Sequence, residues 1–408
     1  MAEIPETPVS PGFPGAANDY WPASLGPLLF LAAIFLINFL SRIIFGPLLV
    51  EIERELHLGH KEAGALFLFI TIGYSAALLG SGALAARLTH RRLIIGSTLG
   101  LGMFLLLLSR PQPLWLLTAN LLLLGLCAGI YLPSGMATLT SIVKPLHWGK
   151  AVAVHELAPN LGFVLAPFLA EAFLRWSSWW GLLTALSGCS LLLGLAYARY
   201  GRGGTFKGEA PTFQTVSVLL RDPSFWIMMV MFGLGVGTSF GVYTMLPLYL
   251  ISERGLDRTW ANTLIALSRV AGLFIAFGAG WFVDRWGVRR SLAFFFGATG
   301  VLTILLGTLA GPWLTAVIFL QPLAAVCFFP AGFTAIGRIG PPKLRNVAVG
   351  FTIPLGFMFG GGLIPTGIGW AGEQASFSAG IIGVGLITLL CLPLIRWLKL
   401  TAIADQRH

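Results

Sequence analysis

Charged residues are scarce in this chain: 10% of its 408 residues are Asp, Glu, Lys or Arg, whereas 56% are hydrophobic. Soluble domains usually carry about 25% charged residues. A soluble fold of this length could not cover its surface with so few charges, so much of its hydrophobic surface must face lipid. The composition therefore excludes a soluble globular protein and predicts an integral membrane protein.

Catalytic and metal-binding patterns are also missing. The four cysteines all lie in apolar stretches, without metal-ligand or disulfide spacing, and are interpreted as packing residues. The sequence has no Ser-His-Asp set and no phosphate-binding glycine loop with lysine. These absences argue against a membrane enzyme or an ATP-driven pump, and no cofactor is expected.

The first residues lack the features of a secretory signal. Residues 1–20 contain no Lys or Arg and no long apolar run. They are rich in Pro, Gly and acidic residues, which favours a disordered cytoplasmic tail over residues 1–23.

A net charge of +10 suggests nucleic acid at first sight. The basic residues, however, lie in short connections between apolar segments and not in runs on a polar face. This distribution is typical of membrane topology. No nucleic-acid partner is expected, and the protein is predicted to lie in the lipid bilayer.

Twelve apolar segments are long enough to cross a bilayer, which requires roughly 20 residues each. The fold class predicted is an all-α membrane protein with twelve transmembrane helices. The expected spans are 24–50, 62–85, 92–109, 113–143, 151–174, 178–198, 224–251, 260–283, 290–309, 312–337, 346–370 and 375–398.

The distribution of basic residues predicts the orientation. With the N-terminus placed in the cytoplasm, 18 of the 26 Lys and Arg residues fall on the cytoplasmic side, 6 fall on the opposite side and 2 lie within spans. This bias predicts a multi-pass protein of the cell inner membrane with both termini cytoplasmic.

The chain repeats itself across its longest internal polar stretch. At a shift of 197 positions the end of the fourth span matches the end of the tenth, and at a shift of 198 the loop at Arg91 matches the loop at Arg289. We therefore expect two pseudo-symmetric six-helix bundles, as in secondary transporters. Their predicted limits are 24–198 and 224–399, joined by a cytoplasmic linker over 199–223 and followed by a tail over 400–408.

The loop after the eighth span resembles the loop motif of the major facilitator superfamily, Gly-x-x-x-Asp-Arg-x-Gly-x-Arg-Arg. The matching residues are Gly280, Asp284, Arg285, Gly287, Arg289 and Arg290. The resemblance implies a cytoplasmic latch between helices, and it implies a transporter that works as a monomer. The first-half copy departs from the motif, because Ala86 and Thr89 stand where Asp and the second Gly would be.

Ionisable residues inside a membrane indicate function, because each costs about 2.5–3.5 kcal/mol at the bilayer centre. The expected spans hold Arg42, His155, Glu156 and Arg269, with Glu156 as their only carboxylate. Positive charge therefore exceeds negative charge deep in the membrane.

Arg42 lies in the outer part of the first span, and Asn38 shares its helix face. The alternative to a substrate-binding role is that Arg42 extends along the helix to the lipid headgroups.

Arg269 lies about 14 Å along the eighth span from Trp260, close to the midplane. Asn262 lies on the same face.

An arginine in the eighth helix is similar to the substrate arginine of the oxalate, nitrate and monocarboxylate branches of the superfamily. A structural alternative is that Arg269 pairs with a backbone carbonyl or with Glu156. A guanidinium group binds carboxylate, nitrate or phosphate through paired hydrogen bonds and stays charged at every working pH. One arginine from each half would hold the anion while the halves rock about it.

Glu156 and His155 are the candidates for carrying a coupling proton, although adjacent helical residues point about 100° apart. The alternative is that Glu156 bridges helices near the cytoplasmic end. Tyr74, Tyr131 and Tyr243 could donate hydrogen bonds to a bound anion.

The sequence thus predicts a secondary transporter for a small anion, an organic monocarboxylate or similar acid, coupled to H⁺. Two alternatives stay open: a proton-driven exporter of drugs or neutral metabolites, and an uncoupled facilitator. A membrane receptor or assembly protein is not favoured, because it would be expected to carry a large extramembrane domain and the longest predicted non-membrane segments are the tail and the loop over 198–223. A Gly run at Gly360–Gly362 is similar to the nitrate branch, but the other marks of that branch are missing. No single branch is therefore indicated.

Overall fold

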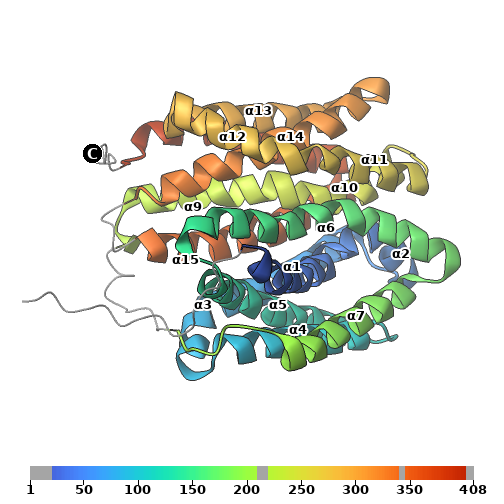
Figure 1. The fold of residues 1–408 in the computed structure, drawn as a ribbon. Coiled ribbons are helices and arrows are strands. Elements are labelled where there is room, and N and C mark those ends of the chain that lie inside the picture. Colours follow the sequence, from blue (N-terminus) through green and yellow to red (C-terminus); the bar gives the residue numbers. More distant parts are fainter. Residues whose placement is uncertain (1–20, 209–218, 340–344, 401–408) are drawn as a thin grey trace, which may run out of the picture.

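The computed structural model describes residues 21–208, 219–339 and 345–400, and these form an all-helical bundle (Figure 1). Most of the two expected tails, namely residues 1–20 and 401–408, and the middle of the expected linker lie outside these residues. The first half contains α1 (Trp21–Ile43), α2 (Phe45–Leu56), α3 (His60–Arg87), α4 (His90–Leu108), α5 (Leu114–Ile142), η1 (Pro145–His147), α6 (Trp148–Trp176) and α7 (Trp179–Tyr200).

The second half interrupts its helices more often. It contains α9 (Pro223–Val236), η2 (Gly237–Gly241), α10 (Val242–Leu248), η3 (Tyr249–Glu253), α11 (Arg258–Val270), α12 (Gly272–Trp286), α13 (Val288–Thr308), α14 (Gly311–Ile336), α15 (Arg345–Phe357), η5 (Met358–Leu363), α16 (Ile364–Gln374), α17 (Phe377–Leu390) and η6 (Leu392–Trp397). The segments η2, η3 and η5 are π-helical turns, a geometry often found at functional sites.

Among the described residues, 11 helices are long and apolar enough to cross a membrane. The expected span over 260–283 is not one of them, because its helix breaks at Ala271 into α11 and α12, of 13 and 15 residues. Gly272 begins the second piece, and glycine is a poor helix former. The two pieces together occupy the place of the missing span, and the break follows Arg269 directly.

The first span is also broken and is longer than expected. α1 ends at Ile43, and Pro47 in the first turn of α2 explains this, since proline clashes with the carbonyl four residues earlier. The helix then continues to Leu56, and α6 continues to Trp176. Glu51 therefore lies within a span-forming helix, and Glu171 lies within the expected span 151–174 itself, so the expectation that Glu156 is the only carboxylate in the spans is wrong.

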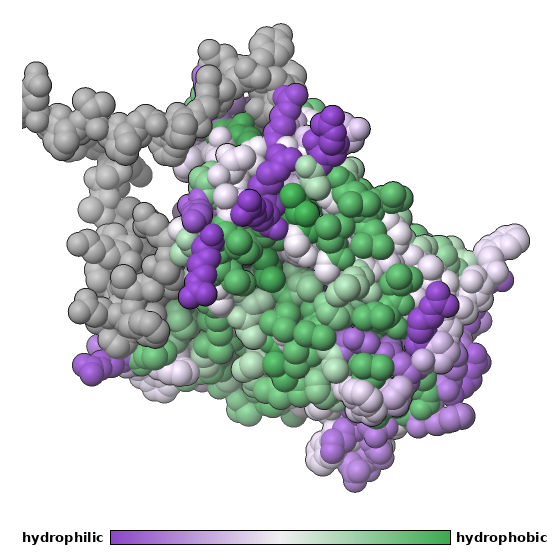
Figure 2. Space-filling view, turned by 90° about the horizontal axis from the view of Figure 1, so that it is seen from below, coloured by the Kyte–Doolittle hydropathy of each residue, from purple (hydrophilic) through white to green (hydrophobic). Residues whose placement is uncertain are grey.

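The molecule has a hydrophobic belt, as a membrane requires. Figure 2 shows hydrophobic side chains across the middle of one face and hydrophilic side chains gathered toward its ends. Large apolar side chains that face outward include Leu192 at 69% exposure and Phe274 at 72%. Lipid would cover these side chains, because water would not stabilise so wide an apolar surface.

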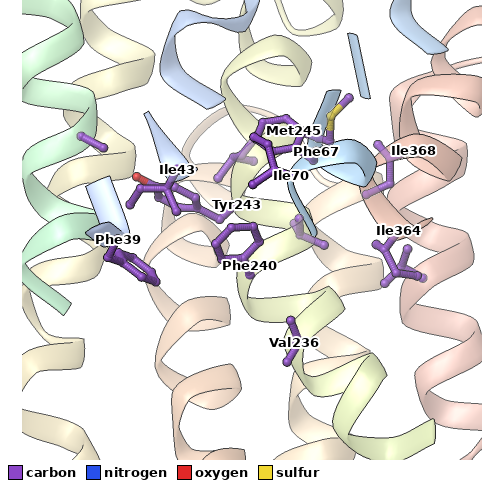
Figure 3. Close-up of a cluster of buried hydrophobic side chains, with 14 of the residues drawn as sticks. Phe39, Ile43, Phe67, Ile70, Val236, Phe240, Tyr243, Met245, Ile364 and Ile368 are labelled. Atoms are coloured by element: carbon purple, nitrogen blue, oxygen red, sulfur yellow. The ribbon is translucent and has the colours of Figure 1, made fainter. Parts of the chain in front are cut away.

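The two halves meet where α2 packs on α10, where α3 packs on α15, η5 and α16, and where α6 packs on α11 and α12. Figure 3 shows apolar side chains from both halves interlocked at this boundary, with Phe39 and Phe67 from the first half near Phe240 and Ile364 from the second. All four are less than 9% exposed. We call the end of the bundle away from η6 and the α7–α9 linker the distal end, on the right in Figure 1.

One glycine in the second half allows a particularly close approach. A Cβ atom at Gly360 in η5 would lie 2.2 Å from the Gly233 carbonyl oxygen of α9, whereas a Cβ at Gly367 in α16 would meet nothing within 4 Å. Gly360→Ala should lower stability by about 1–3 kcal/mol through overpacking. Gly367→Ala is the matched control and should be neutral or slightly stabilising. Thermal unfolding in detergent measures both, and equal melting temperatures would contradict the close approach.

Candidate functional site

Arg269 lies where the two halves face each other, at the end of α11 beside the helix break. Its side chain is buried, and its Nη2 donates to the Ser239 carbonyl oxygen in η2 at 2.8 Å. The guanidinium carbon stands 4.5 Å from the ring centre of Phe163 in α6 and 4.6 Å from that of Tyr243 in α10. Nη1 is buried without a hydrogen-bond partner. The contact with a backbone carbonyl, which was the structural alternative for Arg269, is thus present. Nη1 nevertheless remains a free donor.

Arg42 has a similar setting in the first half, at the end of α1. It is 3% exposed, so it does not extend to the lipid headgroups. Its guanidinium carbon lies 4.1 Å from the ring centre of Tyr74 in α3 and 5.1 Å from that of Phe39. Its Nε is buried and has no hydrogen-bond partner.

Neither arginine has a carboxylate partner in the part of the chain that the structure describes. The ion pairs found there involve Arg54, Arg175, Arg258 and two histidines. A cation over aromatic rings gains about 2 kcal/mol when desolvated, which is small beside the cost of burying an unpaired charge. The two buried cations therefore lack a neutralising negative charge, and a bound anion would supply one.

Aromatic rings connect the two arginines. Phe163 lies at the centre: its ring centre is 5.0 Å from Phe39 and 4.8 Å from Tyr243, both edge-to-face. Phe357 of α15 approaches from the far side, 5.5 Å from Tyr74 and 6.0 Å from Phe240. We call the set Phe39, Tyr74, Phe163, Phe240, Tyr243 and Phe357 the aromatic cluster.

Two small cavities border Arg269. One lies within the second half and is lined by Tyr243, Ser268 and Gln321 among others. The other lies between the halves, where Asn160 and Phe163 of α6 face Arg269. Arg269 therefore borders empty space from two sides, whereas neither of these cavities reaches Arg42.

The other polar residues predicted for the substrate site are dispersed. Asn38 donates to the Ala128 carbonyl oxygen at 3.0 Å and so links α1 to α5. Asn262 is 1% exposed, and both polar atoms of its amide lack a partner. Tyr243 contacts Arg269 with its ring, and its hydroxyl donates to the Phe163 carbonyl oxygen at 2.8 Å.

Tyr131 belongs to a separate buried group around His155 in the first half. The Tyr131 hydroxyl donates to the Leu31 carbonyl oxygen at 2.7 Å and lies 3.1 Å from His155 Nε2. Because that hydroxyl hydrogen is committed to the carbonyl, the His155 Nε2–H is the donor in the second bond. His155 is fully buried, stacks on Phe35 at 4.4 Å and leaves Nδ1 without a partner.

Glu156 is the charge beside this histidine. Its side chain is 49% exposed, and its Oε1 lies 3.6 Å from His155 Nδ1, which is too long for a hydrogen bond. The two side chains approach each other despite leaving the helix in different directions. Within the described chain Glu156 pairs with no arginine, so neither a bridge to the loop motif nor a pair with Arg269 is formed.

A cluster of charges that sequence reasoning missed joins the halves at the distal end. Arg258 of α11 binds Glu51 of α2 at 2.9 Å and Glu171 of α6 at 3.3 Å, and the Thr259 hydroxyl donates to Glu171 at 2.7 Å. The side chains of both glutamates are only about a tenth exposed. We call these four residues the distal cluster. These residues lie near the ends of the expected spans, where charged residues are common, so nothing in the sequence singled them out. They are far apart along the chain, and only the packing of the helices brings them into contact.

The loop-motif residues lie at the opposite end and make contacts within their own half. Arg289 donates to the Leu398 carbonyl oxygen after the last helix. The residue matched to it by the repeat, Arg91, donates to the carbonyl oxygen of Ala198 in the last turn of α7 and to that of Gly201 just after this helix. Each thus binds the end of the last helix in its half, as arginines near helix C-termini do.

The remaining motif residues are mostly on the surface. Asp284, Arg285 and Arg290 are exposed, and Gly280 is half-buried with open space around it. Gly287 has φ of 81°, a conformation that favours glycine and explains this motif position. In the first half, where Asp is missing, the segment after α7 pairs with the loop instead: Arg91 N donates to the Gly204 carbonyl oxygen at 2.7 Å.

Two repeated helical halves with buried charges at their boundary define a secondary transporter. The chain belongs to the Major Facilitator Superfamily, whose sequence model matches residues 31–351. This confirms the family suggested by the loop motif and the all-helical membrane fold, while leaving the branch unresolved.

Similar proteins differ in what they are named for. A 4-hydroxybenzoate transporter, PcaK of Pseudomonas putida, is 24% identical over 87% of this chain and 91% of its own length. A Na⁺, Li⁺, K⁺/H⁺ antiporter of Planococcus maritimus is 24% identical over 54% of this chain, and the match spans about half of that relative, 56%. A bacterial homologue of the lysosomal transporter Spinster, in an inward-facing and occupied conformation, shares the fold with a TM-score of 0.76 at 14% identity, covering 93% of this chain and 96% of that one.

Proposed function

We propose that this transporter moves a small organic anion, a carboxylate, across the membrane together with a proton. The observation that carries the proposal is the pair of buried arginines, Arg42 and Arg269, one from each half. Each has a nitrogen without a partner, and neither meets a carboxylate among the described residues. A carboxylate binding to Arg269 would satisfy its free donor and neutralise a charge that is costly to leave unpaired.

Of the two relatives, the one that matches more of the chain supports an anionic substrate. PcaK, which matches nearly the whole chain, is named for an anion at neutral pH. The cation antiporter matches over about half the chain. Cation binding calls for carboxylates in the central site, and the described residues around Arg42 and Arg269 supply rings, amides and hydroxyls instead. We therefore place anion transport ahead of cation or drug export.

Coupling to a proton is assigned to His155 with Glu156 beside it. His155 Nδ1 is buried without a hydrogen-bond partner, and the Glu156 carboxylate lies 3.6 Å from it, so two groups that can carry a proton stand side by side. Alternating access would open the distal end by separating the distal cluster. An uncoupled facilitator is the alternative, in which transport would not respond to a pH gradient.

Thermal stabilisation of the purified protein in detergent tests the proposal. A panel of carboxylates, inorganic anions, organic cations and neutral metabolites is compared on wild type, Arg269→Ala and Arg290→Ala. We expect one class of carboxylate to raise the melting temperature of wild type and of the exposed control Arg290→Ala. In Arg269→Ala, the loss of a buried charge-assisted pair should weaken binding by about 2–5 kcal/mol. Stabilisation by cations or neutral compounds alone would contradict the proposal.

A further inference from the structure

We infer that the transported anion is an aromatic carboxylate, a planar ring bearing one carboxylate group, and that Phe163 recognises its ring. The inference rests on the proposed function, because it takes the same site and names the substrate class. The feature that carries it is the wall of the cavity beside Arg269, in addition to the buried charge.

The cavity between the halves joins one charged group to walls that are polar on one part and apolar on another. Arg269 and Phe163 line it together with the polar side chains of Asn160 and Ser268 and with Gly272, Pro322 and Val326. Gly272 presents no side chain, and the nearest atom to a Cβ placed there would be a Val326 methyl at 4.0 Å. A carboxylate at Arg269 would thus place the rest of the ligand beside the Phe163 ring and the lining formed by Gly272, Pro322 and Val326.

Phe163 is the member of the aromatic cluster best placed to meet a ligand. Its partners Phe39, Phe240 and Tyr243 are at most 5% exposed, whereas Phe163 is only half-buried and borders the cavity. Its contacts with Phe39 and Tyr243 are edge-to-face, at interplanar angles of 73° and 79°. A benzoate ring that entered beside Phe163 could make a further edge-to-face contact with the Phe163 ring.

The geometry favours an aromatic over an aliphatic acid. Aromatic pairs stabilise each other beyond the area they bury, by an amount that corresponds to about three- to tenfold in affinity. A saturated ring of the same carbon skeleton makes the apolar contact but lacks the additional stabilisation of an edge-to-face contact between aromatic rings. In this state the cavity has a volume of about 10 Å³, enough for about one water molecule, so the ring enters only when α6 separates from α11, as alternating access requires.

The test compares benzoate with cyclohexanecarboxylate, which has the same charge and carbon skeleton without the aromatic ring. Dissociation constants come from the dependence of melting temperature on ligand concentration. The proteins are wild type, Phe163→Leu, Phe163→Tyr and the control Phe168→Leu, whose phenylalanine lies on the same helix but is 41% exposed.

We expect wild type to bind benzoate about three- to tenfold tighter than cyclohexanecarboxylate. That preference should disappear in Phe163→Leu and persist in Phe163→Tyr and Phe168→Leu. Equal binding of the two acids by wild type would overturn the aromatic inference while leaving anion transport intact. Binding of neither acid, with stabilisation by cations or neutral compounds, would overturn the proposed function itself. A preference that survives in Phe163→Leu would overturn the role of Phe163.

Discussion

Arg258→Ala is expected to open the distal end of the protein. The substitution leaves Glu51 and Glu171 without the cation that joins them, and both side chains are about a tenth exposed. Removing one partner of a buried ion pair costs about 3–5 kcal/mol. Since Arg258 is 30% exposed, solvent reduces this, and we expect about 2–3 kcal/mol, or roughly 30- to 150-fold in the equilibrium between closed and open forms.

Distances between spin labels on the two halves would report the change. Arg110 and Trp313 are exposed residues near the distal end, one in each half, and suit labelling in a background from which the four cysteines are removed. Arg258→Ala should shift the distance distribution to longer values. Arg54→Ala is the matched control, because Arg54 is 77% exposed and pairs with Glu51 within its own helix. An unchanged distribution in Arg258→Ala would show that the distal cluster does not hold the halves together.

His155→Gln is expected to uncouple transport from the proton gradient. Glutamine keeps an amide that can donate to Tyr131 but cannot carry a proton, so the buried contact at 3.1 Å can be retained without the titrating ring. In proteoliposomes with an acidic outside, accumulation of the anion driven by the pH gradient should be lost, because the new side chain cannot carry a proton. Exchange of internal for external anion needs no net proton movement and should continue.

Two further variants make this result interpretable. His57→Asn changes an exposed histidine at the distal end whose φ of 52° suits asparagine, and it should leave coupling intact. Glu156→Gln distinguishes the two candidates: loss of accumulation there, with His155→Gln unaffected, would assign the proton to the carboxylate. Normal accumulation in both variants would contradict proton coupling at this pair.

Much of the architecture followed from pattern alone. Apolar runs of about twenty residues predict helices reliably, because backbone groups in lipid must satisfy their hydrogen bonds within the segment. The two-half organisation followed from the repeated loop, and Arg91 and Arg289 make matching contacts at the ends of α7 and η6. The position of Arg269 near the middle of its span was also predicted, since depth along a helix depends only on sequence distance.

The surroundings of the charges could not be predicted in this way. Arg42 and Arg269 were recognised as deep charges, but the rings of Tyr74 and Phe163 beside them come from other helices. Tyr131 was expected at the substrate and instead contacts His155. The helix break after Arg269 was also unexpected, because glycines are common in membrane helices and few of them interrupt one.

By itself, the sequence determined that this protein is helical, spans the membrane repeatedly and consists of two related halves. These properties depend on composition and on spacing along one segment at a time. Only the tertiary structure decided which charges lack a counterion and which hold the halves together. Glu51 and Arg258 are separated by 207 positions and yet form one ion pair. Such contacts depend on how distant helices pack, and no local pattern of residues encodes that packing.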